Sequence, residues 1–488
     1  MKCPKKALAF IGAVALLFQG GCSAPDQENR ENWETVIECQ YEDMGISPNQ
    51  QFLIAKKGGL YGAYVKNGDS YELKIPFQYV NIAYDSYEDA NLFCYLSTFE
   101  VDMYDAYGKK CNDRPFRAVW NITTEKYKDG YPVSYNDADW GFISKTGEWI
   151  VEPAYDHIQP LEDGTLILSS KDGDDWVDTE GKTLLPFDEP VSIHRSSVAS
   201  GIVVTVRDKN SDKESTGVLG GDGEYKIPPI YKEITAGQDN AGNSFFMCIA
   251  WDGKGYVLDE RQNVLFEYDG KCTIVPTGNR QFIVMDSLKN PSWMGLLSDT
   301  GEWIIYNKGV KGIEVAGELV KVLGEETDWL YDTNGNILSE FSQKTVFLKE
   351  DAKLSDPLAY LQTKELKWGF TSGDGSVSIA PEYVESYGPF PYNDLLMVSR
   401  DGKWGCVNYQ NETKIEFQYS NILVPFTEEG YAYVTQGNTA GIINTQGETV
   451  VPFVFENPDI QLTAYTSRMV GTMAIVKKDG TYGCIQIV

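Results

Sequence analysis

The stretch WGFISKTGEWIVEP, which runs from Trp140 to Pro153, contains the pattern that decides the fold. It opens with an aromatic residue followed by Gly141, continues as a short apolar run, and reaches a second glycine at Gly147. Glycine tolerates the positive φ angles of tight turns. The pattern therefore predicts a strand of about five residues, a turn and a second strand.

This aromatic–glycine pair, which we call the anchor, recurs along the whole chain. Its clear copies are Tyr61-Gly62, Trp140-Gly141, Trp368-Gly369, Trp404-Gly405 and Tyr482-Gly483. Degenerate copies stand at Thr216-Gly217, Gly255-Tyr256, Met294-Gly295 and Ala440-Gly441, decayed ones centre on Trp176 and Trp329, and a missing copy is expected near Asp102. The successive gaps run about 35 to 42 residues, which is the signature of a repeat architecture.

Two further marks follow each anchor at similar distances. Glycine usually stands six residues after the anchor glycine, and Asn411 takes that place after Gly405. Beyond this turn comes a proline or apolar residue and then an aromatic, as in IPFQYVNI (Ile75–Ile82) and IEFQYSNI (Ile415–Ile422), which agree at six of eight positions. An apolar segment with a glycine turn, such as DLLMVSRDGKWG (Asp394–Gly405), then leads to the next anchor and predicts a hairpin.

A unit of three or four such strands cannot bury its own apolar face, whereas stacked units can. The anchors are therefore interpreted as packing residues that fill the joints between units. The fold class is predicted to be all-β, with about twelve short β-meander or hairpin modules over residues 51–488. A closed propeller, two smaller propellers and an open superhelix all remain open, and long helices are not expected.

The N-terminus has the pattern of a secretory leader. Lys2, Lys5 and Lys6 precede an uncharged apolar run from Ala7 to Phe18, which is too short to span a bilayer. The small residues before Cys22 resemble a bacterial lipobox, in which the cysteine is lipidated. Residues 1–21 are accordingly predicted to be a lipoprotein signal peptide, Cys22 the lipidation site, and residues 22–50 a polar tether. Ordinary secretion is the alternative interpretation.

Charge and cysteine usage narrow the functional classes. The formal net charge is −29, and removal of the three leader lysines makes it 39 − 71 = −32. Such a chain repels phosphate backbones, so nucleic acid is not expected as a partner, although a cation or a basic partner is compatible with the charge. The cysteines show no CxxC pair, and seven remain without Cys3 and Cys22. Cys94 and Cys111 could form a disulfide, or the thiols could be buried and free.

No recognisable catalytic or metal motif is present. His157 and His194 are the only histidines, and neither GxSxG nor HExxH occurs, so no catalytic residue, metal or cofactor is predicted. The segment Asp332–Asn336 (DTNGN) has the alternating oxygens of a calcium loop, but it aligns with ordinary repeat turns and is interpreted as one. A glycosidase-type carboxylate pair is defined by separation in space and stays open.

These marks resemble the bacterial WG-repeat family, whose unit reads approximately WGFIDxxGxxVIPPxYDxIxxFxxGLAxVxxxGK. The resemblance covers about residues 52–488 and is strongest at Trp140–Ile158 and Trp368–Gly447. It implies an exported or surface β-repeat protein without a defined activity, and it supplies no catalytic residue.

The expected function is a non-enzymatic binding or scaffold lipoprotein of the bacterial cell envelope. It is expected to be held outside the membrane by its lipid anchor and to present a repeat surface to a protein or glycan ligand. The alternative is a propeller-type hydrolase that acts on glycans through a carboxylate pair.

Overall fold

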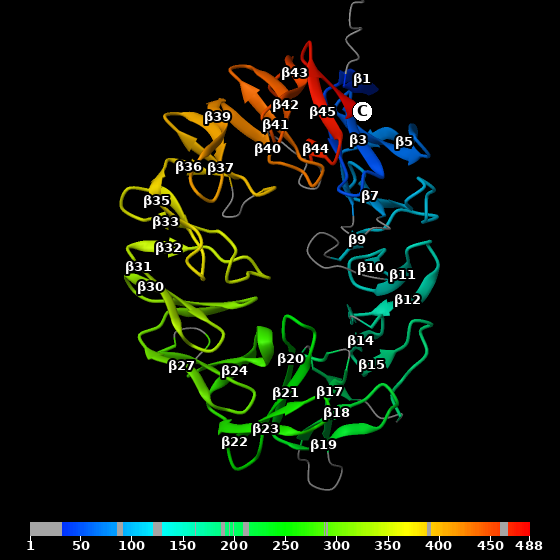
Figure 1. Ribbon diagram of the computed structural model, residues 1–488. Helices are drawn as coiled ribbons and strands as arrows, with labels where there is room; N and C mark the ends of the chain where they lie inside the picture. The colour runs from blue at the N-terminus through cyan, green and yellow to red at the C-terminus, as the bar shows by residue number, and fades with distance from the viewer. Residues whose placement is uncertain are drawn as a thin grey trace, which may run out of the picture.

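A computed structural model shows a chain built almost entirely from short antiparallel strands arranged around a closed ring (Figure 1). The structure describes residues 32–488 except 85–90, 121–128, 162, 187–190, 195, 199, 208–213, 287, 289–290, 388–391 and 459–466. In these residues the only helical element is the 3-10 turn η1 (Gly278–Arg280). The expected all-β fold class is confirmed.

The strands fall into consecutive small sheets, which we number as modules. Module 1 contains β2 (Asp43–Ile46), β3 (Phe52–Lys57), β4 (Leu60–Asn67) and β5 (Ser70–Tyr79); module 2 contains β6 (Asn81–Tyr84), β7 (Leu92–Tyr95) and β8 (Val101–Tyr104). Module 3 contains β9 (Ala118–Val119), β10 (Gly130–Ser134), β11 (Trp140–Ser144) and β12 (Trp149–Tyr155); module 4 contains β13 (His157–Pro160), β14 (Leu166–Ser170) and β15 (Gly173–Val177). Module 5 contains β16 (Ser192–Ile193), β17 (Ile202–Arg207), β18 (Glu214–Leu219) and β19 (Tyr225–Tyr231); module 6 contains β20 (Glu233–Gln238), β21 (Ser244–Ile249), β22 (Lys254–Asp259) and β23 (Val264–Asp269).

The other six follow in the same order. Module 7 contains β24 (Thr273–Pro276), β25 (Phe282–Met285), β26 (Trp293–Leu297) and β27 (Trp303–Lys308); module 8 contains β28 (Gly312–Ala316), β29 (Leu319–Leu323), β30 (Thr327–Asp332) and β31 (Ile337–Ser342). Module 9 contains β32 (Lys344–Val346), β33 (Leu358–Gln362), β34 (Lys367–Thr371) and β35 (Ser378–Tyr383); module 10 contains β36 (Glu385–Ser386), β37 (Leu396–Arg400), β38 (Lys403–Val407) and β39 (Thr413–Tyr419). Module 11 contains β40 (Asn421–Val424), β41 (Tyr431–Gln436), β42 (Thr439–Asn444) and β43 (Thr449–Glu456); module 12 contains β44 (Met469–Val470), β45 (Met473–Lys478), β46 (Thr481–Ile487) and, from the other end of the chain, β1 (Trp33–Tyr41).

The described residues form twelve modules, as the repeat spacing predicts. Eleven sheets are present, and the eight-stranded one comprises modules 11 and 12, which are linked through the single pair Glu456↔Lys477. Each module is an antiparallel meander of three or four strands in chain order, except that module 12 borrows its last strand.

That borrowed strand closes the ring. β1 pairs antiparallel with β46, so the N-terminal strand completes the last module and then continues directly into β2 of module 1. Figure 1 shows β1 next to the C-terminal end of the chain, where the ring closes. Of the three arrangements compatible with the sequence, the structure adopts the closed ring.

The predicted boundary between tether and array is therefore wrong in part. Residues 33–46 lie within the expected tether, yet they form β1 and β2 and belong to modules 12 and 1. β1 pairs with the edge of β46, which would otherwise present unpaired backbone groups, and β2 pairs with β3. The predicted signal peptide over residues 1–21 and the lipidation site Cys22 lie outside the described residues.

The hydrophobic core is divided among the joints between modules, which we call seams. One buried apolar cluster lies at each of the twelve seams, and each cluster draws residues from two consecutive modules. In β3, Phe52 and Ile54 pack into seam 1/2, whereas Leu53 and Ala55 pack into seam 12/1. Alternate side chains of a strand point to opposite faces, so each inner strand stabilises two seams at once.

The predicted turns are confirmed. Gly147 has a φ of 94° and Asn411 a φ of 63°, each at the sixth residue after its anchor glycine. The anchor glycine serves a different purpose, because it lies in the third strand opposite a bulge in the fourth. In module 10, Trp404 pairs with Tyr419 and Cys406 pairs with Ile415. The third strand advances by two residues between these pairs while the fourth strand advances by four, which makes the bulge. A Cβ on Gly405 would lie 2.7 Å from the carbonyl oxygen of Ile415.

The bulge and the glycine occur together in the modules with clear anchors, whereas module 7 carries Gly295 without a register shift at that place. A Cβ on Gly141 would lie 2.7 Å from the carbonyl oxygen of Val151, again beside a register shift in the fourth strand. Modules 6 and 8 carry Tyr256 and Trp329 at the glycine position, and their fourth strands pair without a shift there. The proline or apolar residue and the aromatic residue that follow the turn thus form the bulge, and the absence of a Cβ on the anchor glycine leaves space for it.

Candidate functional site

The predicted anchor residues occupy equivalent places in their modules. Each aromatic lies in the third strand opposite an aromatic of the fourth, in the pairs Tyr61↔Tyr79, Trp140↔Tyr155, Trp368↔Tyr383, Trp404↔Tyr419 and Tyr482↔Tyr41. The glycines Gly62, Gly141, Gly369, Gly405 and Gly483 follow them, and a Cβ on any of these would lie within 2.8 Å of another residue's backbone oxygen.

Two more positions meet the anchor aromatic at a seam. The stacking position adjoins the module's own first strand, directly after it in modules 3, 9 and 10 and directly before it in module 12. In modules 3, 9, 10 and 12 it holds Trp120, Phe347, Tyr387 and Arg468, each placed against its own anchor ring. The seam position is the second residue after the fourth-strand aromatic, where the next module begins. It holds Asp43, His157, Glu233 and Glu385 at seams 12/1, 3/4, 5/6 and 9/10.

An aromatic cleft opens at seam 9/10. It has a volume of about 420 Å³ and is lined by Trp368, Glu385, Ser386, Tyr387 and Trp404. Trp404 is buried and Tyr387 is half-buried, with their ring centroids 6.3 Å apart. Glu385 is exposed and accepts a hydrogen bond of 3.3 Å from the hydroxyl of Ser399. The cleft thus combines flat apolar rings with one carboxylate.

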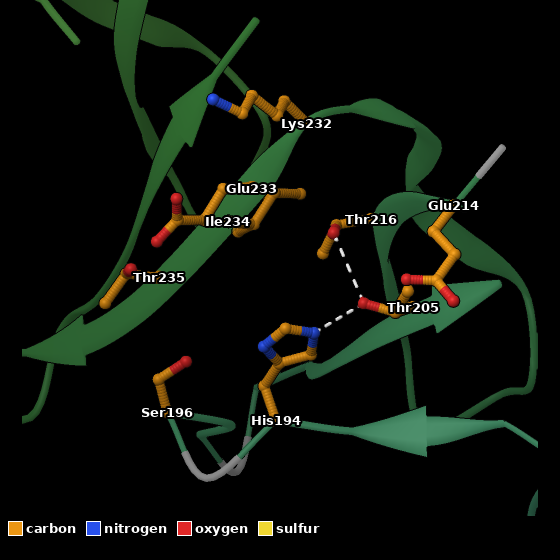
Figure 2. Close-up of a pocket in the computed structure, with 9 residues that line it drawn as sticks. All are labelled: His194, Ser196, Thr205, Glu214, Thr216, Lys232, Glu233, Ile234 and Thr235. Atoms are coloured by element: carbon orange, nitrogen blue, oxygen red, sulfur yellow. Dashed lines mark hydrogen bonds between the residues drawn. The ribbon is translucent and has the colours of Figure 1, made fainter.

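A polar cleft of about 390 Å³ lies at the corresponding place of seam 5/6 (Figure 2). Thr216 stands where seam 9/10 has Trp368, and Glu233 stands where it has Glu385. His194 Nε2 lies 2.5 Å from Thr205 Oγ1, which in turn is 3.4 Å from Thr216 Oγ1. Glu214 and Lys232 complete the charged lining. One backbone frame therefore builds an aromatic cleft in one place and a polar cleft in another.

Seam 12/1, where the ring closes, is filled by a cation of the chain itself. Arg468 is 6% exposed, and its Nη1 donates a 2.9 Å hydrogen bond to Asp43 Oδ1 and another to the carbonyl oxygen of Met44. Its guanidinium carbon lies 4.9 Å from the ring centre of Tyr482, the anchor of module 12. Neighbouring Tyr61 has its pKa raised by burial and by the negative charge of Asp43, while Arg468 acts in the opposite direction.

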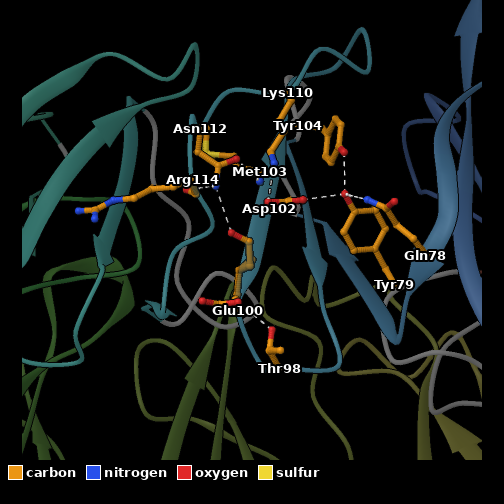
Figure 3. A network of polar contacts seen from close by, with 11 residues as sticks. Gln78, Tyr79, Thr98, Glu100, Asp102, Met103, Tyr104, Lys110, Asn112 and Arg114 are labelled. Atoms are coloured by element: carbon orange, nitrogen blue, oxygen red, sulfur yellow. Dashed lines mark hydrogen bonds and ion pairs between the residues drawn. The ribbon is translucent and has the colours of Figure 1, made fainter.

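At seam 1/2 a buried carboxylate takes the place of the anchor glycine. Asp102, in β8, accepts a 2.8 Å hydrogen bond from the hydroxyl of Tyr79, and its other oxygen lies 2.8 Å from the ammonium of Lys110 (Figure 3). Tyr104 contacts the same Tyr79 hydroxyl at 2.6 Å. The missing repeat expected near Asp102 is therefore present as module 2, and the polar groups there bind one another within the seam.

The weaker sequence candidates resolve into structural roles. Asp332 Oδ1 accepts hydrogen bonds from the backbone amides of Asn334 and Asn336, which is an ordinary turn. His157 packs edge-on against Trp120 at a centroid distance of 5.6 Å. Cys94 and Cys111 are free thiols, as are the other five cysteines among the described residues.

Two properties of the described residues bear on ligands and membranes. No group of three or more His, Cys, Asp or Glu side chains there is placed to hold a metal ion. Within the same part of the chain, no helix has the length and apolar character needed to cross a membrane.

The cleft residues Glu385, Tyr387 and Glu233 were not singled out by sequence reasoning. Glu385 and Glu233 have one sequence signal, which is a fixed offset, because the seam position follows the fourth-strand aromatic by two residues. No single module contains the whole cleft, since its walls come from two modules in succession.

Comparisons with solved structures return many remote neighbours. A eukaryotic initiation factor has 10% identity and a TM-score of 0.35, covering 63% of this chain and 89% of that one. BamB from Moraxella catarrhalis has 14% identity and a TM-score of 0.24, covering 70% and 98%. PorZ, a bacterial surface component of the type-IX secretion system of Porphyromonas gingivalis, has 8% identity and a TM-score of 0.21, covering 93% and 86%.

Sequence comparison is more specific. No curated protein matches the chain. The model of the WG containing repeat matches residues 140–173, 368–404, 404–439 and 441–457, which lie in modules 3 and 4 and in modules 9 to 11. Each match includes an anchor pair or begins at its glycine, and the chain therefore carries WG containing repeats at four places.

Proposed function

We propose that this chain is a non-catalytic binding or scaffold protein whose β-ring presents the clefts at its seams to a protein or glycan ligand. The observation that carries the proposal is the reuse of one frame with different linings. Seam 9/10 offers aromatic rings and a carboxylate, whereas seam 5/6 offers hydroxyls, an imidazole and charges. Repeat proteins bind ligands in this way, because their backbone is fixed and their surface residues vary.

The aromatic cleft fits binding better than hydrolysis. Glycoside hydrolysis uses two carboxyl groups across the scissile bond, and Glu385 is the one carboxylate that lines this cleft. Aromatic faces in an open cleft supply contact area with little loss of side-chain freedom.

The test of this function is a paired assay on the purified chain. Glycan and peptide arrays measure binding, and a panel of hydrolase substrates measures turnover. We expect saturable binding without turnover. Catalytic turnover that disappears in Glu385→Gln or Glu233→Gln would contradict the proposal.

One observation favours a second candidate function, a glycan-active hydrolase. Glu214 and Glu233 line the same polar cleft at seam 5/6, so two carboxylates do share a cavity. If this cleft is an active site, Glu214→Gln and Glu233→Gln should each abolish turnover on the substrate panel, while Glu385→Gln should leave it intact.

We further propose that the protein is exported and held outside a bacterial membrane by a lipid on Cys22. The basic start, the apolar run and the small residues before Cys22 support this assignment. Since β1 begins at Trp33, eleven residue steps separate the anchor from the ring, a reach of at most about 40 Å. Metabolic labelling with a palmitate analogue should mark the protein and fail on Cys22→Ala; labelling that persists in this variant would refute lipidation at Cys22.

A further inference from the structure

The closing seam shows what kind of group the seam frame can hold. At seam 12/1 the guanidinium of Arg468 lies against the anchor ring of Tyr482, pairs with Asp43 at the seam position, and donates to the carbonyl oxygen of Met44. Tyr61, the anchor of the next module, is close enough to Arg468 for the positive charge to act on its hydroxyl. One anchor ring, a carboxylate and the carbonyl of the next strand residue thus hold one planar cation, and the hydroxyl of Tyr61 lies within reach of its charge.

Each of these partners has a counterpart in the cleft at seam 9/10. Tyr482 pairs with Tyr41 as Trp368 pairs with Tyr383, and Asp43 and Glu385 follow those tyrosines by two residues. The counterparts of Met44 and Tyr61 are Ser386 and Trp404, because Asp43 and Glu385 pair with Lys56 and Ser399, which in turn face Tyr61 and Trp404. All four counterparts, namely Trp368, Glu385, Ser386 and Trp404, line the cleft.

What differs is the stacking position. Phe347 stands there in module 9, with its ring 5.3 Å from that of Trp368, where module 12 has Arg468. Phenylalanine lacks the length and the charge of arginine, and a cavity of about 420 Å³ remains beside Glu385. Ser399 also replaces the cationic Lys56, which lies over the ring of Tyr61 in module 1. In the described part of the chain, no ion pair involves Glu385.

We propose that the cleft at seam 9/10 binds the guanidinium group of an arginine side chain supplied by a partner protein. The inference rests on the proposed binding function and names the ligand chemistry of one of its clefts. A guanidinium stacks on tryptophan faces and pairs with a carboxylate, and its planarity suits a slot between rings better than a compact ammonium does. The net charge of −29 attracts basic segments over a longer range.

The test uses the purified chain and a short peptide with one central arginine, flanked by glycine and serine. Tryptophan fluorescence and calorimetry measure its binding, and the same peptide with citrulline, which is isosteric and neutral, is the control ligand. We expect the citrulline peptide to bind at least tenfold more weakly. Glu385→Gln should cause a similar loss, while Glu416→Gln, an exposed carboxylate of the same module, should bind like the parent.

A second variant tests the cleft in a protein that we expect to keep its fold, so that a loss of binding is not explained by unfolding. Phe347→Arg places a guanidinium at the stacking position, as in module 12, and should fill the cleft from within. We expect this variant to melt at or above the parent temperature and to lose peptide binding. Equal binding of the arginine and citrulline peptides, or unchanged binding by folded Glu385→Gln, would overturn the inference.

The two proposals fail in distinguishable ways. If neither peptide binds but the arrays detect a ligand without turnover, the arginine cleft is refuted and the binding function stands. If the chain hydrolyses a substrate through one of its carboxylates, the binding function is refuted, whichever peptide binds.

Discussion

Tyr41 lies opposite Tyr482 across β1 and β46, at the register that places Trp404 opposite Tyr419 within module 10. The N-terminal strand thus supplies the fourth strand of the last module with its usual aromatic, although the two residues belong to opposite ends of the chain. Their rings join the buried cluster that unites modules 12 and 1. The closure of the ring therefore depends on β1.

Deletion of residues 33–41 should open the ring. It removes β1, exposes the edge of β46 and uncovers the cluster at seam 12/1. We expect the melting temperature to fall by roughly 10 °C. A strand contributes several kcal/mol to the free energy of unfolding, and in a large domain each kcal/mol lost lowers the melting temperature by roughly 2–4 °C. Exposed strand edges also favour self-association, which sedimentation velocity would detect. Deletion of residues 23–32, which leaves β1 intact, is the control and should change neither measurement.

Gly405→Ala should be destabilising although it adds a single methyl group. The new Cβ would lie 2.7 Å from the carbonyl oxygen of Ile415 and close to the ring of Phe417, so the bulged fourth strand must move. We expect a loss of about 1–3 kcal/mol in urea unfolding. Gly221→Ala is the matched control, because nothing lies within 4 Å of its added Cβ. Equal stability of the two variants would show that the anchor glycine is not there to accommodate the bulge.

The sequence predicts the modules well because their signals are local. The turn at Gly147 and the anchor at Trp140 lie in one short hairpin, so strand, turn and register can be read together. The closing strand has no such signal. Residues 33–41 pair with the far end of the chain, no turn connects the two, and their mixed polar pattern resembles a tether.

The candidate site is harder to predict for a related reason. Glu385 has no neighbour in sequence that suggests chemistry, and its cleft appears when module 10 packs on module 9. The second strand of most modules also lacks the polar–apolar alternation of a strand with one buried face. In β37 the run from Leu396 to Ser399 is continuously buried, because the strand packs against neighbours on both faces.

The thiols should differ sharply in reactivity. Burial raises the pKa of both Cys248 and Cys406 to about 12, so at pH 8 only about one molecule in ten thousand carries either thiolate. Cys39 and Cys272 are half-buried, although desolvation raises their pKa as well. Pulsed alkylation read by mass spectrometry should label Cys39 and Cys272 first and reach Cys248 and Cys406 only after denaturation. Early labelling of Cys406 in the folded protein would contradict its buried placement.

The ion pair of Arg468 and Asp43 should stabilise the closed ring, because the Asp43 carboxylate compensates the buried positive charge of Arg468. Arg468 is 6% exposed, and Asp43 supplies its carboxylate partner at 2.9 Å. Asp43→Asn keeps the shape but leaves a buried cation without its counter-charge, which costs about 3 kcal/mol for a buried pair. Arg468→Met removes the cation and keeps an apolar side chain beside Tyr482. We therefore expect the double variant to be more stable than Asp43→Asn alone in urea unfolding. If the two substitutions were strictly additive in this double-mutant cycle, the guanidinium would owe its place to packing alone, and the parallel with the carboxylate of Glu385 would lose its basis.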